Sequence, residues 1–247
     1  MQEVIQYIPI ATTCVALAFA AVLFARWRAK GGGPHLLWWG IGMLTYAAGT
    51  ITESSTTLFG WHEPVFRAWY ITGALLGGAP LAQGSVYLHL NRRTANLLTV
   101  ALVSAIVVAS VCVLLSPINY GLVDPHRLTG KVLVWRWVRM FSPFINLYAL
   151  VFLAGSAAWS AWRFAKRADT WNRFVGNSYI AIGALLPGIG GAFTRFGHTE
   201  VLYVTEFVGL VMIFTGYRYA TRGSITAAPS TLAAASGGGA PSRSATG

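Results

Sequence analysis

Seven apolar runs separated by short polar connections account for most of this chain. Each run is about 20 residues long and carries few charges, which is the length an α-helix needs to cross the hydrocarbon core of a bilayer. The pattern therefore predicts an all-α integral membrane protein, a single bundle of seven transmembrane helices. The expected helices cover residues 5–26, 36–59, 66–90, 95–116, 134–162, 176–195 and 200–220.

The composition supports the same class. Of 247 residues, 55% are hydrophobic and only 10% are charged, and the mean hydropathy is +0.57. A soluble domain carries about 25% charged residues. A formal charge of +11 would suggest a nucleic-acid partner in a soluble protein, but here the basic residues cluster between apolar runs, where they act as topology signals. We therefore expect a lipid bilayer around the chain and no nucleic acid.

The charges also predict an orientation. The first run follows MQEVIQY, which has no positive charge, and precedes Arg26, Arg28 and Lys30, the reverse of a secretory signal peptide. An N-terminus outside places twelve of the 18 lysines and arginines on the inner side and six on the outer side. Because inner connections are enriched in Lys and Arg, we expect a multi-pass protein of the cell inner (cytoplasmic) membrane, with its C-terminus in the cytoplasm.

The composition shifts from Gly223 onward to Ser, Ala, Gly, Thr and Pro without apolar periodicity. We therefore expect a transmembrane domain over 1–222 and a disordered cytoplasmic tail over 223–247. So short a tail predicts no kinase, cyclase or binding domain, so that a signal would pass to a cytoplasmic partner.

Ionisable side chains inside the apolar runs are the informative ones, because a charge in hydrocarbon is unfavourable and should face the bundle interior. Glu53 shares one helical face with Tyr46, Thr50 and Thr57. Other polar and aromatic residues are expected at a similar, outer depth. Together these candidates for a ligand-binding site are Glu53, Arg67, Trp69, Tyr70, Arg139, Arg195, Tyr203 and Glu206.

Two interpretations of these residues remain open. In the first, Glu53 and Glu206 each pair with an arginine, with Arg67 and Arg195 as the preferred partners, and the pairs lock the helices together. In the second, the residues line a pocket that opens outward and holds a small ligand with an anionic or carbonyl group.

Glycines and a proline interrupt two of the expected helices. GALLGGAP ends at Pro80, and GALLPGIGG contains Pro187. Such sequences kink helices or let them approach closely, and interrupted helices line substrate sites in transporters. Both uses stay open, and Gln83 is the polar side chain placed to gate the middle of the third helix.

No motif for a catalytic, nucleotide-binding or metal site is present, so the sequence leaves open whether the chain is an enzyme. The three lysines lie outside helix centres, which excludes a retinal Schiff base. We expect no metal and no cofactor. A haem held by His35 and His89 is an alternative, because both are expected near the cytoplasmic side.

Residues 38–87 resemble the seven-helix membrane sensory modules of bacterial sensor kinases. The resemblance lies in the acid of ITESS, the aromatic entry FRAWYITG, the small residues and proline of GGAPL, and the aromatic exit VYLHL. It implies a sensory or ligand-binding bundle with Glu53, Trp69 and Tyr70 in the corresponding places. Those proteins carry a cytoplasmic effector domain, which this chain is not expected to have.

Three functional hypotheses follow. The leading one is a non-enzymatic, ligand-binding or sensory membrane protein with a polar pocket in the extracytoplasmic half. The second is a small-solute or proton-coupled transporter, favoured by the interrupted helices and buried carboxyls. The third is an integral-membrane enzyme acting on a lipid, quinone or carotenoid-like substrate, with Glu53 or Glu206 as acid or base.

Overall fold

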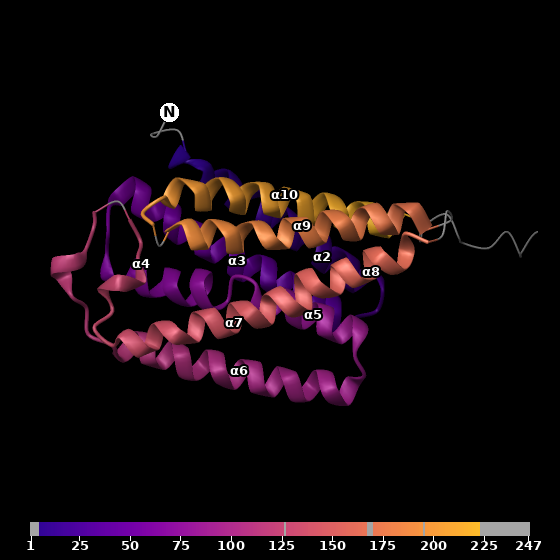
Figure 1. The fold of residues 1–247 in the computed structure, drawn as a ribbon, viewed down its shortest axis with the longest axis horizontal. Coiled ribbons are helices and arrows are strands. Elements are labelled where there is room, and N and C mark those ends of the chain that lie inside the picture. Colours follow the sequence, from indigo (N-terminus) through magenta and orange to yellow (C-terminus); the bar gives the residue numbers. More distant parts are fainter. Residues whose placement is uncertain (1–4, 126, 167–169, 195, 223–247) are drawn as a thin grey trace, which may run out of the picture.

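A computed structural model describes residues 5–125, 127–166, 170–194 and 196–222 of the chain. Within these ranges the protein is a bundle of long helices that run nearly parallel or antiparallel to one another (Figure 1). The helical segments in chain order are α2 Ile8–Ala29, α3 Pro34–Phe59, α4 Glu63–Trp69, η1 Tyr70–Leu75, α5 Ala79–His89, α6 Arg92–Leu115, η2 Tyr120–Leu122, η3 Gly130–Val132, η4 Arg136–Met140, α7 Phe141–Ala149, η5 Leu150–Gly155, α8 Ser156–Phe164, α9 Trp171–Thr194 and α10 Thr199–Arg222.

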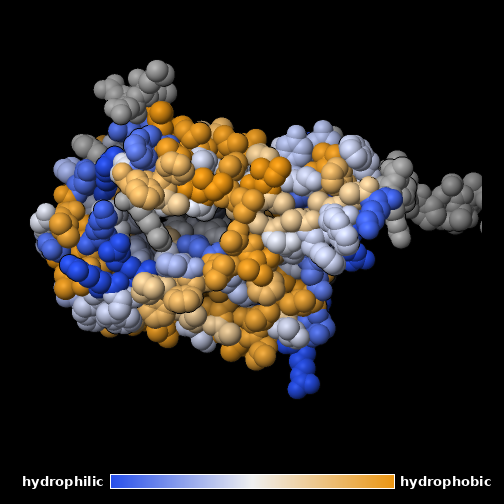
Figure 2. All heavy atoms as spheres, viewed as in Figure 1, coloured by the Kyte–Doolittle hydropathy of each residue, from blue (hydrophilic) through white to orange (hydrophobic). Residues whose placement is uncertain are grey.

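Five helical stretches of the described chain are long and apolar enough to cross a membrane. They cover residues 8–29, 92–115, 136–164, 171–194 and 199–221. Apolar side chains also point out of the bundle: Leu97 is 70% exposed and Phe144 is 67% exposed. Figure 2 shows hydrophobic atoms over the middle of the molecule and hydrophilic atoms at its ends. These features fit an all-α, multi-pass membrane protein, because only a lipid solvent favours so much exposed apolar surface.

The predicted break in the third helix is present. After α4 the backbone widens into the π-helix η1 and then turns at residues 76–78, and α5 starts with Pro80 in its first turn. A proline fits there because the first N–H groups of a helix have no intrahelical partner. A β-carbon on Gly77 would lie 2.5 Å from the Gly73 carbonyl oxygen, so the turn requires a glycine. By contrast, α9 continues through Pro187.

Glycines set the contact between α9 and α10. A β-carbon on Gly183 would lie 2.6 Å from the carbonyl oxygen of Gly209, and one on Gly176 would lie 2.6 Å from that of Gly216. The glycines recur every seven residues on both antiparallel helices, which brings the two backbones together along one seam. In α9 the small residues therefore serve close packing.

Residues 116–125 and 127–135, here called the end segment, fold over one end of the bundle (Figure 1, left). Asn119 N donates to Val132 O at 2.8 Å, and Val134 N donates to Pro117 O at 3.0 Å. These bonds hold the segment as a short irregular hairpin. Its buried side chains Val132 and Leu133 belong to the same apolar cluster as Phe66, so the end segment is part of the core.

Candidate functional site

Glu53 is a buried carboxyl near the end of α3 that adjoins the end segment. Its side chain is only 5% exposed. The indole Nε1 of Trp69, on α4, donates a hydrogen bond to Glu53 Oε1 at 3.0 Å. Two of the expected site residues, from the second and third apolar runs, therefore meet inside the bundle. An indole N–H is a donor only, so this contact can satisfy one carboxyl oxygen.

Glu206 of α10 is the second carboxyl at this place. The Glu206 and Glu53 side chains lie within interaction range of each other. Tyr46 strengthens the junction, since its hydroxyl donates to the backbone carbonyl of Glu206 at 3.2 Å. Tyr203, one turn before Glu206, is buried and lies within electrostatic range of both carboxyls. The site thus joins α3, α4 and α10.

The polar face predicted for α3 lies against protein. Thr50 is 3% exposed, and its hydroxyl lies 2.7 Å from that of Thr13 on α2. This arrangement agrees with the rule that polar stripes in membrane helices avoid lipid.

The site is reachable from one side. Glu206 and Trp69 are partly exposed, as are residues 71–74 and 76–78 of the interrupted helix. Figure 2 shows a hollow in the surface between the layer that contains α9 and α10 and the layer that contains α6 and α7. The partial exposure of Glu206 and Trp69 therefore fits a recess in the surface of the bundle.

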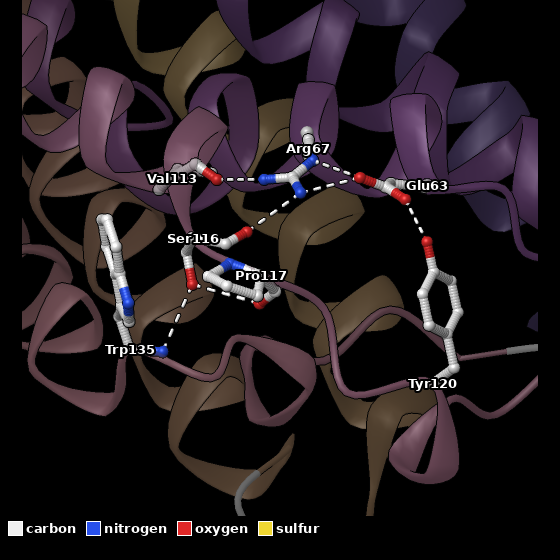
Figure 3. Close-up of polar contacts among 7 residues, drawn as sticks. All are labelled: Glu63, Arg67, Val113, Ser116, Pro117, Tyr120 and Trp135. Carbon is white, nitrogen blue, oxygen red and sulfur yellow. Dashed lines mark hydrogen bonds and ion pairs between the residues drawn. The ribbon is translucent and has the colours of Figure 1, made fainter.

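Arg67 does not pair with Glu53, contrary to the first interpretation. Its Nε and Nη2 donate to Glu63 Oε1 at 2.9 and 2.7 Å, four residues earlier on α4. The same guanidinium donates to the carbonyls of Val113 and Ser116, the latter at 3.0 Å, at the end of α6 (Figure 3). Arg67 therefore caps α6, where a cation also meets the negative end of the helix dipole.

Glu63 extends this cluster into the end segment. The hydroxyl of Tyr120 donates to Glu63 Oε2 (Figure 3). This hydrogen bond and the ion pair with Arg67 hold the pKa of Glu63 below its ordinary value, and the hydrogen bond raises the pKa of Tyr120. Arg67, Glu63 and Tyr120, here called the end latch, thus fix the end segment to α4. The i,i+4 spacing of Glu63 and Arg67 was the sequence signal for this pair.

The remaining expected site residues are dispersed. Arg139 is exposed in η4. Tyr70 is 4% exposed, and a β-carbon on Gly130 of the end segment would lie 2.7 Å from its ring, so the end segment covers it. Arg195 lies outside the described residues, as does the expected tail over 223–247. Near Tyr203 the structure adds Arg127, which sequence reasoning did not select and which donates to Gly197 O at 2.6 Å.

Gln83 is fully buried and belongs to a separate polar network. Its Nε2 donates to Thr99 Oγ1 at 2.7 Å and to Ala95 O at 3.1 Å, and the Tyr148 hydroxyl donates to its Oε1 at 2.5 Å. The network ties α5 to α6 and α7. Both the nitrogen and the oxygen of the Gln83 amide have protein partners, which fits a packing role.

His89 has both ring nitrogens in hydrogen bonds. Nδ1 lies 2.9 Å from Ser85 O, and Nε2 lies 3.1 Å from Ser160 Oγ. A haem iron bound by His89 would have to displace one of these partners. Within the described residues there is no group of three or more His, Cys, Asp or Glu side chains that could hold a metal ion.

The fold and this site define a helical membrane protein with two carboxyls close together inside the bundle, one buried and one partly exposed. No protein-family model, curated protein or solved structure matches the chain.

Proposed function

We propose that the chain is a ligand-binding, sensory membrane protein of the cell inner membrane, whose seven apolar runs all cross the bilayer with the N-terminus outside. The α3 helix and the α4–η1–α5 segment would add two crossings to the five apolar stretches. The end segment and the Glu53 site then lie in the extracytoplasmic half. The positive-inside distribution of Lys and Arg supports this orientation.

The observation that carries the proposal is that two carboxyls lie together inside the bundle, the buried Glu53 of α3 and the partly exposed Glu206 of α10. Charged groups deep in a membrane bundle are unfavourable for stability, so their presence marks a functional site more often than a structural one. Here neither described arginine expected at the site is available to neutralise them, since Arg67 belongs to the end latch and Arg139 is exposed. The site is rich in hydrogen-bond acceptors, which favours a ligand that donates hydrogen bonds or carries positive charge over the anionic or carbonyl-bearing ligand first expected.

A ligand at this junction would act on the cytoplasmic side through the helices themselves. Glu53 and Glu206 lie on α3 and α10, which continue to the opposite end of the bundle, and Trp69 ends α4, which leads through η1 and a turn into α5. A ligand that changes the distance between these side chains would shift α10 against α3. The connections on the cytoplasmic side would then present a different surface to a signalling partner.

Hydrogen–deuterium exchange of the full chain in nanodiscs tests this proposal. Methylammonium, acetate and acetone serve as cationic, anionic and carbonyl probes. We expect at least one probe to slow exchange in peptides that contain Glu53 and Glu206 and to change exchange in the connection at residues 30–33. The change should disappear in Glu53→Gln and persist in Glu200→Gln, a carboxyl on the same helix as Glu206. Unchanged exchange with all three probes would refute ligand binding here.

Transport is the second candidate, because α4–η1–α5 is interrupted beside the site. The carbonyl of Ala74 in η1 accepts hydrogen bonds from Ser142 Oγ at 2.9 Å and Asn146 Nδ2 at 3.3 Å instead of from its own helix. Interrupted helices of this kind line substrate paths. Uptake of the effective probe into proteoliposomes that depends on Glu53 would select the transporter, and binding without uptake would select the sensor.

A further inference from the structure

One oxygen of Glu53 lacks a donor. Oε2 is buried and accepts no hydrogen bond from an N–H or hydroxyl group of the described residues. Leaving a buried polar group unpaired destabilises a protein by about 1–3 kcal/mol, more for a charged one. The carboxyl of Glu206 lies within interaction range of Glu53. Two carboxylates side by side have no proton to share, whereas one proton on the pair supplies a donor for the unpaired oxygen.

The charge of the pair leads to the same conclusion. In general, two negative charges about 4 Å apart repel each other by roughly 4 kcal/mol at an effective dielectric constant of about 20. No lysine or arginine in the described parts of the chain forms an ion pair with either carboxyl. A pair with one proton carries a single negative charge. If that proton leaves, another positive charge has to take its place.

The surrounding groups supply no such charge from within the described structure. On α3 the neighbouring titratable group is Tyr46, and on α10 it is Tyr203. From α4 the indole of Trp69 faces Glu53 and is neutral. From the end segment, the cation that acts on Tyr203 is Arg127, which is exposed and bonded to Gly197 O. A replacement cation would therefore come from solution.

We propose that Glu53 and Glu206 form a monovalent-cation site in which the entering cation displaces the shared proton. The carboxyl O–H bond breaks, its proton passes to water through the recess, and the cation lies between two carboxylates. The site carries one negative charge before and after, so the exchange adds no further charge to it. The inference rests on the proposed site and specifies its ligand, but it does not require signalling.

The cation could be an alkali ion or an ammonium group. Both carboxylates would bind an alkali ion through oxygen, whereas an ammonium would donate N–H bonds and could also contact the rings of Trp69 and Tyr203. A divalent ion fits less well, because two carboxylates with an existing proton would leave most of its coordination to water.

Proton release from the purified full-length protein tests the proposal. Sodium, potassium or methylammonium chloride is added to the protein in unbuffered detergent solution that contains a pH-indicator dye. We expect release of about one proton per chain with at least one of the three cations. The apparent affinity for that cation should rise about tenfold per pH unit, as one-for-one competition requires. The most effective cation identifies the alkali or ammonium class.

Infrared difference spectra give a second readout. The carbonyl band of a protonated carboxyl group should be present without the cation and decrease when it is added. Glu206→Gln and Glu53→Gln should abolish the release, and Glu200→Gln should retain it. Wild-type protein that releases no proton with any of the cations, and whose carboxyl band does not change, would overturn the proposal. A probe response in deuterium exchange without proton release would leave the proposed function standing and reject the exchange, so the two failures are distinguishable.

Discussion

Glu53 and Glu63 lie ten residues apart and have opposite surroundings. Glu63 has a cation one turn away and a tyrosine hydroxyl from the end segment. Glu53 has an indole N–H and a second carboxyl. The first environment stabilises a carboxylate, whereas the second makes full ionisation of the pair unfavourable. The same residue type therefore supports a structural latch at one position and a candidate ligand site at the other.

Arg67 should matter for stability and not for the ligand site. The Glu63 side chain is 34% exposed, so screening weakens its pair with Arg67, but Arg67→Gln also leaves carbonyls at the end of α6 without their charged donor. We expect a loss of about 2 kcal/mol in unfolding free energy, measured by denaturant titration in mixed micelles. Arg139→Gln, an exposed arginine of η4, is the matched control and should stay within about 0.5 kcal/mol of wild type. Equal effects in both variants would contradict the capping role.

The end latch should respond to acid. The Tyr120 hydrogen bond, followed by Arg67, lowers the pKa of Glu63 in the folded protein. A lowered folded pKa stabilises the fold above the unfolded pKa, and this stabilisation is lost as the pH falls through the lowered value. Deuterium exchange of residues 116–122, relative to the intrinsic exchange rate at each pH, should therefore accelerate at acidic pH, below the ordinary range of a glutamate. In Tyr120→Phe the acceleration should begin at a higher pH; the same onset in both proteins would argue against the latch.

At the scale of elements, the two glycine-rich helices do different things. In the third apolar run the glycines permit a turn between η1 and α5. In α9 they face α10 and let two backbones touch. The two similar sequences GALLGGAP and GALLPGIGG thus end as a break in one helix and a packing seam beside another. Only the neighbouring helix distinguishes the two roles.

Two glycines of α9 provide a matched test of that seam. Gly183→Ala places a methyl group 2.6 Å from the Gly209 carbonyl oxygen, whereas a β-carbon on Gly188 meets nothing within 4 Å. Gly183→Ala should lower the unfolding free energy by about 1–3 kcal/mol through overpacking. Gly188→Ala should be neutral or slightly stabilising, because alanine favours the helix. Thermal unfolding in detergent distinguishes the two variants. If Gly183→Ala has the stability of the wild type, close contact between α9 and α10 does not contribute to stability.

At the scale of the whole molecule, the bundle has a closed end and an open recess beside it. The end segment packs into the core over the ends of α4, α6 and α7. Arg127 links it to the turn between α9 and α10. The end segment is therefore held at two places, by packing against α4, α6 and α7 and by the bond to this turn.

Membrane topology can be measured on intact spheroplasts. Single cysteines at Gly121 and Gly32 are introduced after Cys14 and Cys112 have been replaced by alanine. A membrane-impermeant maleimide should label position 121 of the end segment and should reach position 32 only after lysis. Labelling of position 32 in intact spheroplasts would reverse the proposed orientation and place the Glu53 site in the cytoplasmic half.

The sequence by itself determined the class of protein and the positions of its helices, because long apolar runs have no stable solution except helices in lipid. It also indicated that Glu53, Trp69, Tyr203 and Glu206 would lie at a similar depth, since depth follows from position along a crossing helix. Only the tertiary structure decided which of them touch. Arg67 and Glu53 were expected as partners at one level, but rotation about the helix axes directs Arg67 to Glu63 and α6, and directs Glu53 to Trp69 and Glu206. Periodicity fixes a residue's height and face, whereas partner choice depends on the azimuth and packing of neighbouring helices, which no local pattern specifies.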